Sequence, residues 1–565
     1  PTGPIDNFTV VAFSANGQIL PWRRDDVDMY AFHVNVPSGA GVLHAKVEFL
    51  ATAPPTGFSA GASTTANLAI VSWNEFVLYP PGDAAGDVSV EPSIRLPDGW
   101  KFATALTQTS QEADTIHFQP VTLETLIDSP VLAGRYFKEI PLAEDVTPKH
   151  YLDMVADGPE DLKPSTELIS AFSNLVREAG ALYKSHHYES YHFLVALSDG
   201  VAHFGLEHHE SSDNRIGART FLDEDSWLLV GDLLPHEFTH SWNGKYRRPA
   251  GLATANYQQP MKGELLWIYE GLTQYLGDIL AVRSGIWTPE QYRAYLAASA
   301  AFLDHRPGRT WRDLEDTAAA SQILYAAPDQ WDNWRRSADY YPEGELIWLE
   351  VDTLLRKLSH GKRSLNDFCA RFLGARDNSS QRVVPYRFED VTGCLNQIQP
   401  YNWAAFLKER LTSKSSHAPL DGITGGGYRI EYTDVENEYI RADESSDRGV
   451  NAWYSLGLRT DDQAIEDVLV ESPAYKAGLG PGMKIVAVNG RQASDELLHQ
   501  AIRDAKESGP LVELIVENTG YFKVVKIDYH GGEKYPHLVR ETNAKATLDE
   551  ILKPMVKRPE IRSAE

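Results

Sequence analysis

Residues 236–240 read His-Glu-Phe-Thr-His, and this segment constrains the chain more than any other. Side chains four residues apart lie on the same face of a helix. His236 and His240 can therefore offer two imidazole nitrogens to one metal ion. Glu237 can direct its carboxylate at a water on that metal, which is the arrangement of the H-E-x-x-H pattern with glutamate as general base. The segment predicts a catalytic metal site on a helix.

The residues on either side of this motif suit a helix. Asp232 is a plausible N-cap, and Pro235 is tolerated only in a first turn, so the helix is predicted to begin close to it. Asn243-Gly244 is a typical helix stop.

A metal held by two histidines usually takes a third protein ligand and keeps one position for water. The apolar segment 265–278 contains Glu270, thirty residues after His240. The segment is predicted to form one helix with this carboxylate in its middle. Because a buried carboxylate needs a partner or a metal, Glu270 is predicted to be the third ligand.

These segments resemble the glycyl aminopeptidase family of the gluzincin zinc metallopeptidases. Trp242-Asn243 follows the second histidine, and Trp-Ile-Tyr-Glu-Gly-Leu-Thr-Gln-Tyr surrounds Glu270. The resemblance extends in pieces from about residue 150 to the C-terminus. It implies a zinc-dependent aminopeptidase with one Zn²⁺, which removes small first residues, Gly and Ala, from peptides with a free N-terminus.

One departure from this family concerns the groups that orient the histidines. Many gluzincins place an aspartate four residues after the ligand glutamate, where this chain has Gln274. The nearest downstream acid is Asp278. Which groups hold the ring N–H of His236 and of His240 therefore stays open.

The same resemblance suggests substrate-binding residues upstream. In related aminopeptidases a Gly-x-x-Glu-Asn strand presents a glutamate to the α-amine of the substrate, and 205–208, Gly-Leu-Glu-His, is similar. Gly205 and Glu207 are assigned to substrate binding, since a carboxylate there would pair with the ammonium group. His208 and His209 are interpreted as pocket wall.

A tyrosine is expected to complete the site. Related enzymes carry Tyr-x-Lys-Gly, whose phenol donates a hydrogen bond to the tetrahedral intermediate. Tyr341 stands three residues before Gly344 and takes this role by position, with Tyr340 as its rival and Glu343 in place of the lysine. Glu237 is expected to take a proton from the attacking water and to pass it to the leaving amine.

Composition supports several folded domains. The 565 residues suggest three or four domains at roughly 150 residues each, and 42% hydrophobic residues allow proper cores. The net charge of −26, without a basic run, argues against a nucleic-acid partner. No apolar run approaches the ~20 residues of a membrane span.

The two cysteines, Cys369 and Cys394, allow one disulfide and require none. The chain starts Pro-Thr-Gly without methionine, which a cleaved secretory signal or a trimmed chain would explain. A periplasmic or secreted location is expected, with a cytoplasmic one as the alternative.

The predicted fold class is multidomain. Short, partly alternating strands at 8–13, 30–36 and 43–50 indicate an N-terminal β-sandwich over residues 1–150. The resemblance implies a thermolysin-like α+β catalytic domain with a helical lobe at 151–427. A β-rich module follows at 428–535, and then a tail with a short helix at 536–565.

The β-rich module resembles PDZ domains in the run Ser-Pro-Ala-Tyr-Lys-Ala-Gly-Leu at 472–479 and in Val-Asn-Gly at 488–490. PDZ domains hold a peptide C-terminus at a sheet edge, and 454–458 occupies the place of the carboxylate-binding loop. Capture of a peptide tail and packing on the catalytic domain both stay open as roles.

Two other readings of the whole chain are considered. The first is a gluzincin endopeptidase, in which Glu207 does not bind an amine. The second is a PDZ adaptor whose metallopeptidase domain is inert; the intact set of metal ligands together with Glu237 argues against it.

Overall fold

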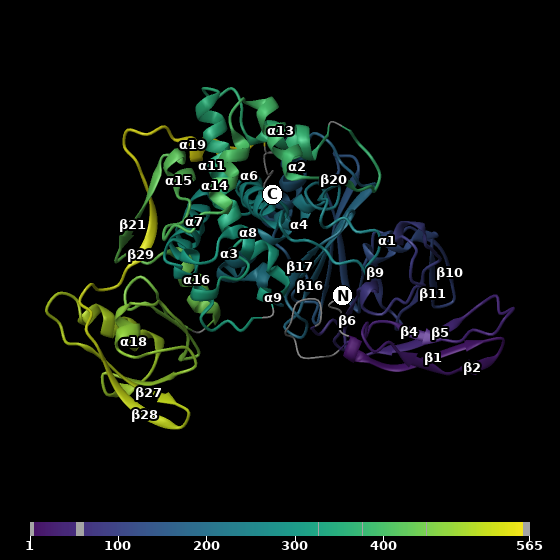
Figure 1. Ribbon diagram of the computed structural model, residues 1–565, viewed down its shortest axis with the longest axis horizontal. Coiled ribbons are helices and arrows are strands. Elements are labelled where there is room, and N and C mark those ends of the chain that lie inside the picture. The colour runs from purple at the N-terminus through teal and green to yellow at the C-terminus, as the bar shows by residue number, and fades with distance from the viewer. Residues whose placement is uncertain (1–4, 52–60, 326, 376, 448, 558–565) are drawn as a thin grey trace, which may run out of the picture. The chain divides into compact units, whose positions relative to one another are not determined.

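The computed structural model describes residues 5–51, 61–325, 327–375, 377–447 and 449–557 (Figure 1). The chain forms two compact units. The first comprises Pro1–Ser165, His187–Leu222 and Ala253–Met261, and the second Thr166–His186, Asp223–Leu252 and Lys262–Glu565.

The N-terminal part of the first unit is built from small, mostly antiparallel sheets, which confirms a β-rich N-terminal region. Their strand orders are β2-β1-β5, β3-β4, β6-β13-β9, β10-β11-β8 and β12-β7. Its description as a sandwich stays a prediction. The strands are β1 Phe8–Ala15, β2 Gln18–Leu20, β3 Trp22–Arg24, β4 Phe32–Val34, β5 His44–Phe49, β6 Leu68–Val71, β7 Ser89–Val90, β8 Ser93–Arg95, β9 Lys101–Ala103, β10 Gln108–Glu112, β11 Thr115–Phe118, β12 Val121–Thr122 and β13 Val131–Gly134.

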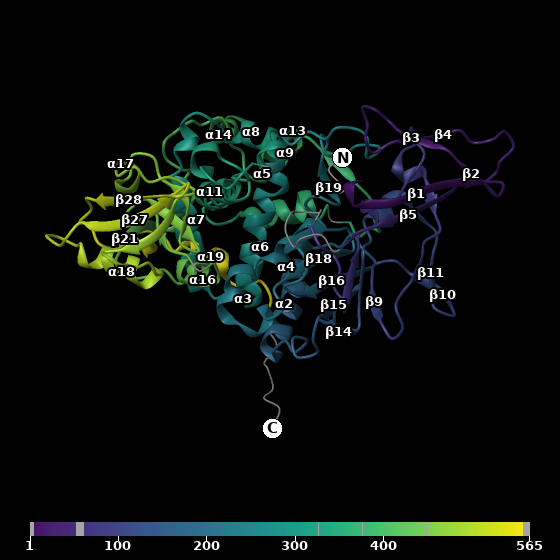
Figure 2. The same cartoon turned by 90° about the horizontal axis from the view of Figure 1, so that it is seen from below.

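The first unit also holds a five-stranded mixed sheet of order β14-β15-β16-β18-β17 (Figure 2). Its strands are β14 Tyr136–Leu142, β15 Lys149–Ala156, β16 Ser190–Leu197, β17 Phe204–Glu207 and β18 Ser211–Ile216. Strands β15, β16 and β18 run parallel to one another, whereas β14 pairs antiparallel with β15 and β17 pairs antiparallel with β18. All six residues of β18 are buried, as expected for a strand covered on both faces. Strand β17 lies at the edge and ends at Glu207.

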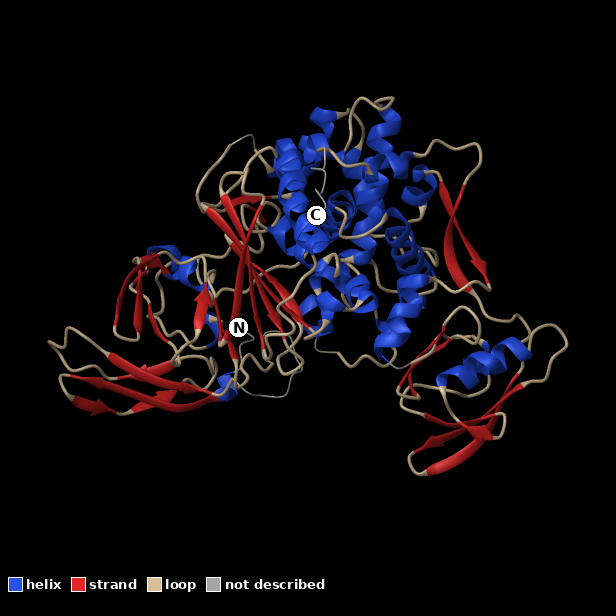
Figure 3. Ribbon diagram, turned by 180° about the vertical axis from the view of Figure 1, so that it is seen from behind, coloured by secondary structure: helices blue, strands red, loops and turns tan. Residues whose placement is uncertain are grey.

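The second unit is mainly helical up to residue 426 (Figure 3). Its interior contains large side chains with almost no exposed surface, among them Trp242, Trp267, Trp287, Trp348 and Trp403. The longer helices are α2 Thr166–Tyr183, α3 Glu224–Val230, α4 Leu233–His240, α6 Gly271–Ser284, α7 Pro289–Asp304, α11 Pro342–Leu358, α13 Phe388–Ile398 and α14 Trp403–Leu411. Shorter ones are α5 Leu266–Tyr269, α8 Leu314–Ala319, α9 Ser321–Tyr325, α10 Asp332–Arg335, α12 Leu365–Phe368 and α15 Asp421–Gly426, and β19 Arg247–Pro249 pairs with β20 Val384–Tyr386.

Glycines let helix α6 approach its neighbours closely. A Cβ added at Gly277 would lie 2.9 Å from the Cα of His236 on α4. At the start of α6, a Cβ on Gly271 would lie 2.6 Å from the Cα of Gly344 on α11. Only glycine allows backbones this close, so these contacts fix the spacing of α4, α6 and α11.

The C-terminal part of the second unit contains a larger sheet with the path β22-β23-β24-β25-β27-β28, to which β26 adds beside β25. Helix α18, Asp495–Asp504, packs on its core through Leu498, Ala501 and Ile502. The strands are β22 Asn451–Ala452, β23 Leu458–Asp461, β24 Ala464–Val468, β25 Lys484–Val488, β26 Arg491–Gln492, β27 Val512–Asn518 and β28 Tyr521–Ile527; the short helices are α16 Glu438–Asp447, α17 Pro473–Lys476 and α19 Thr547–Leu552.

The predicted domain limits stay predictions. The pairing of two strands affects the predicted boundary between the module at 428–535 and the tail at 536–565. Strand β29, Tyr535–Arg540, pairs with β21, Tyr428–Thr433, so the predicted tail at 536–565 begins inside a strand. Residues 558–565 of that tail, and residues 1–4 and 52–60 of the predicted sandwich, lie outside the described residues.

Several local predictions can be compared with the structure. The single helix predicted at 265–278 is wrong: α5 ends at Tyr269 and α6 begins at Gly271, with Glu270 at the junction. Cys369 and Cys394 are both buried free thiols. Among the residues that the structure describes, none of the helices has the length and apolar character needed to cross a membrane.

Candidate metal centre

Helix α4 carries the two predicted histidine ligands. It begins at Leu233, so Pro235 lies in the first turn as expected. Asp232 precedes the helix without capping it by its side chain; its carboxylate instead accepts a hydrogen bond from Gln274 Nε2 at 2.9 Å. His236 and His240 are 6% and 1% exposed.

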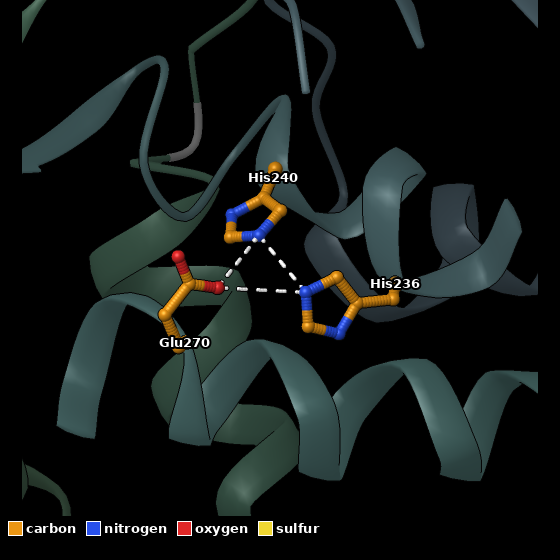
Figure 4. Close-up of side chains that lie close together, drawn as sticks. All are labelled: His236, His240 and Glu270. Atoms are coloured by element: carbon orange, nitrogen blue, oxygen red, sulfur yellow. Dashed lines mark hydrogen bonds and ion pairs between the residues drawn. The ribbon is translucent and has the colours of Figure 1, made fainter. Parts of the chain in front are cut away.

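Three potential ligand atoms converge between α4 and the α5–α6 junction (Figure 4). The Nε2 atoms of His236 and His240 are 3.1 Å apart. Glu270 Oε2 lies 3.5 Å from the first nitrogen and 3.2 Å from the second. Ligand atoms about 2.1 Å from a tetrahedral Zn²⁺ lie ~3.4 Å from each other, so the three distances match such a centre.

The unsatisfied polar atoms also fit a cation. Glu270 Oε2 is buried and has no hydrogen-bond partner among the described residues. Burial raises the pKa of Glu270, but the neighbouring imidazole rings of His240 and His236 outweigh this effect and lower the pKa to about 2. The carboxyl group is therefore ionised at neutral pH, as a metal ligand must be.

Asn243 orients one of the histidines, which answers half of the question left open by the sequence. The carbonyl of Asn243 lies 2.8 Å from His240 Nδ1. A carbonyl can only accept, so Nδ1 carries the proton and Nε2 keeps its lone pair for a metal. His236 Nδ1 is buried without a hydrogen-bond partner among the described residues.

The side chain of Asn243 holds the junction that contains Glu270. Its Nδ2 donates to the carbonyls of Ile268 and Tyr269 at 2.8 and 3.2 Å and to Thr273 Oγ1 at 3.0 Å. One fully buried residue therefore links a histidine ligand to the segment of the carboxylate ligand. The sequence indicated Asn243 as a helix stop and as part of the family resemblance, but no local pattern reveals its bonds to residues so far along the chain.

Glu237 and the tyrosines lie around the same centre. Glu237 is 5% exposed, and one of its carboxylate oxygens lies within 4.8 Å of a ring nitrogen of His240. The ring of Tyr341 stacks on that of His236 at a centroid distance of 5.9 Å. The ring of Tyr340 lies 5.1 Å from that of Tyr341 and is 3% exposed, whereas Tyr341 is half-buried.

Gln274, in the place where relatives carry aspartate, belongs to a buried acidic network that the sequence did not reveal. Its Nε2 donates to Asp232 and to Asp278, the latter at 3.0 Å. Burial, together with the nearby Glu345 and Asp232, raises the pKa of Asp278 well above its usual range. Burial also raises the pKa of Glu345 to about 7.

The predicted substrate residues lie in the first unit. Gly205 and Glu207 are on β17, with Glu207 at its end, and their role toward a site in the second unit stays a prediction. The next two residues are buried histidines that share one carboxylate: Asp128 accepts from His208 Nδ1 and His209 Nδ1, each at 3.2 Å, and from the His209 amide at 2.9 Å. Among the residues that the structure describes, the cluster of His236, His240 and Glu270 includes neither His208 nor His209.

Comparison with known families agrees with this geometry. Residues 230–347 match the family described as M61 glycyl aminopeptidase, and residues 2–135 match the Peptidase M61 N-terminal domain. The chain is a peptidase with M61-family domains. The first match includes His236, Glu237, His240, Glu270 and Tyr341 of this peptidase, and the segment of Glu207 lies outside both matches.

One solved structure shares the fold of the peptidase along nearly its whole length. A crystal structure described as an aminopeptidase N family protein from Idiomarina loihiensis has a TM-score of 0.77 at 21% identity and covers 97% of this chain and 92% of that chain. An M1 zinc metallopeptidase from Deinococcus radiodurans is less similar, with a TM-score of 0.44 at 16% identity over 72% of this chain and 85% of that chain. No curated protein matches the chain.

Proposed function

We propose that the peptidase is a zinc-dependent aminopeptidase with one Zn²⁺ held by His236, His240 and Glu270. The observation that carries this proposal is the convergence of three buried ligand atoms, 3.1–3.5 Å apart, beside the carboxylate of Glu237. When bound, the ion would lower the pKa of a water ligand and polarise the carbonyl group of the scissile bond.

The residues of the chain supply the proton transfers. Glu237 accepts a proton from the attacking water as the water oxygen bonds to the carbonyl carbon of the peptide. The C–N bond then breaks, and Glu237 donates this proton to the leaving amine. Its burial at 5% exposure keeps competing water away from this carboxylate.

Tyr341 is proposed as the donor to the developing oxyanion. A phenol that hydrogen-bonds a substrate must be reachable, and Tyr341 is half-buried whereas Tyr340 is 3% exposed. The stacking of Tyr341 on His236 places its ring beside a metal ligand. Both observations favour Tyr341 over Tyr340.

The aminopeptidase specificity rests on Glu207, with Gly205 beside it in the substrate strand. A glutamate at the end of β17 would pair with the α-ammonium group of the peptide and place the first peptide bond at the metal. The preference for Gly and Ala and the periplasmic or secreted location are proposals from the family resemblance.

For the C-terminal module, we propose a PDZ-like fold that packs within its unit. In the segment expected to bind a carboxylate, the amides of Ser455 and Gly457 already donate to the Ala452 carbonyl, at 3.2 and 2.9 Å. The hydroxyl of the neighbouring Tyr454 donates to the Ala298 carbonyl of α7 at 3.3 Å. These contacts favour packing over capture of a peptide C-terminus.

The test combines metal analysis with matched substrates. We expect one zinc per chain, hydrolysis of unblocked Gly and Ala anilides, and loss of activity with a chelator. N-Acetylated peptides should not be cleaved, and Glu237→Gln should lose turnover while keeping the metal. Cleavage of acetylated peptides would support an endopeptidase instead, and full turnover by Glu237→Gln would refute the mechanism.

A further inference from the structure

Arg336 has a backbone conformation that is rare for a residue with a side chain. Its φ of 64° and ψ of 157° belong to a region populated almost only by glycine. Such strain persists only where the surrounding structure holds the residue in place. The side chain of Arg336 has no exposed surface, so buried contacts must supply this restraint.

The restraint comes from two buried acids and a carbonyl. Arg336 Nε donates to Asp339 Oδ2 at 2.6 Å, Nη1 donates to the Arg312 carbonyl at 2.9 Å, and Nη2 donates to Glu343. Asp339 also accepts from Arg306, at 2.5 Å, and Glu343 also accepts from Arg309. Charge-assisted hydrogen bonds of this kind are stronger and more directional than neutral ones.

Asp339 and Glu343 lie on either side of the two tyrosines. The amide of Glu343 donates to the Asp339 carbonyl at 2.8 Å, and the amide of Tyr341 donates to the Ala338 carbonyl at 3.0 Å. The chain therefore makes a tight turn into α11 with Tyr341 at its N-cap position. Because Arg336 bonds the side chains of Asp339 and Glu343, it restrains the backbone on both sides of Tyr341.

The segment before Arg336 is anchored to the C-terminal module. The amide and the side-chain Nδ2 of Asn333 donate to the two carboxylate oxygens of Asp467 on β24, at 3.1 and 2.6 Å. Asn333 has no exposed surface and Asp467 is 5% exposed. The turn that carries Tyr341 is therefore held from the module as well as from the helical core.

We propose that Arg336 is a positioning residue for catalysis, which holds the phenol of Tyr341 over His236 by bonding Asp339 and Glu343. The proposal rests on the proposed role of Tyr341 in peptide hydrolysis. It also gives the buried carboxylate of Glu343 a role. In this chain a carboxylate is required there as the counterion of Arg336 and Arg309.

A double-mutant cycle between Arg336→Lys and Tyr341→Phe tests this role on the full-length, zinc-loaded protein. Lysine keeps the charge but loses the planar fork that bonds two acids at once. We expect Tyr341→Phe to lower kcat about 100- to 1,000-fold. Arg336→Lys should lower kcat roughly 10-fold with KM changed less than about twofold, because phenol placement matters to the transition state rather than to substrate binding.

The cycle distinguishes a loss of Tyr341 positioning from a general loss of structure or activity. In the Tyr341→Phe background, Arg336→Lys should lower kcat by less than about twofold, because the phenol it positions is already absent. The control Arg363→Lys, at an arginine whose side chain is 54% exposed, should leave kcat and metal content unchanged. Equal, additive losses of kcat in both backgrounds would overturn the proposal.

Two further outcomes remain interpretable. If the Arg336→Lys protein does not fold, the same cycle with Glu343→Gln decides, since glutamine keeps the shape of the side chain but weakens both arginine bonds. If wild-type protein has no peptidase activity, the proposed function itself has failed. If Tyr341→Phe keeps full kcat, the proposed role of Tyr341 has failed and with it the positioning role of Arg336. Additivity in the cycle, in contrast, refutes only the role of Arg336.

Discussion

Gly277 lies where α6 crosses α4 at the metal ligand His236, and Gly277→Ala is a direct test of the site. The added Cβ would lie 2.9 Å from the Cα of His236, 3.0 Å from its amide nitrogen and 3.2 Å from its Cβ. These atoms belong mainly to the backbone, so no rotation of a side chain can relieve the contact. The two helices must separate.

The size of the effect follows from these distances. Ordinary contact begins at 3.4 Å, so α4 must move about 0.5 Å at His236. Overpacking of this kind costs ~1–3 kcal/mol, and the higher helix propensity of alanine recovers up to ~1 kcal/mol. Metal–ligand distances tolerate only ~0.2 Å, so we expect the zinc Kd to rise about 10- to 100-fold.

The assay is a zinc titration against a chromophoric chelator, together with urea unfolding of the zinc-free protein. The matched control is Gly180→Ala, because Gly180 is also inside a helix of this unit and a Cβ there would meet nothing within 4 Å. That control should keep the zinc Kd and gain up to ~1 kcal/mol in stability. A Gly277→Ala protein that binds zinc as tightly as the control would refute the argument.

Three further predictions concern other residues of the site. Tyr341→Phe should lower kcat about 100- to 1,000-fold in steady-state assays while Tyr340→Phe stays within a few-fold, and the reverse order would exchange their roles. Asn243→Ala should raise the zinc Kd roughly 10- to 100-fold in chelator competition, since His240 loses its acceptor and the junction at Glu270 loses its restraint; an unchanged Kd would contradict this. Burial raises the pKa of Glu345 from 4.5 to about 7, so the folded state binds its proton more tightly than the unfolded chain. The stability from this proton is complete below pH 4.5 and falls by on the order of 3 kcal/mol as the pH rises to 7. In urea unfolding between pH 4.5 and 8, the free energy of unfolding of Glu345→Gln should therefore fall less with pH than that of the wild type. An equal fall in both proteins would show that other groups cause it.

The metal ligands and the general base of the proposed site can be predicted from short stretches of the sequence. Helical periodicity alone places His236 and His240 on one face with Glu237 beside them, and an isolated carboxylate in an apolar segment pointed to Glu270. Both inferences need only the spacing of a few residues. The sequence does not reveal the break of the helix at Glu270, because the apolar pattern continues past this residue. The side chain that donates to the carbonyls of Ile268 and Tyr269 belongs to Asn243, which lies far away in the sequence.

The sequence by itself determined which side chains can bind a metal and move a proton, because ligand type and helical spacing are local properties. Only the tertiary structure decided how these groups are held: Asn243 behind His240, and the ion pairs of Arg336 around Tyr341. It also decided the close helix crossing at Gly277. Some of these contacts join residues far apart in the chain, such as Asn243 with Ile268 and Gly277 with His236. Even the short-range ones depend on burial and on distances of a few tenths of an ångström, which no pattern along the chain encodes.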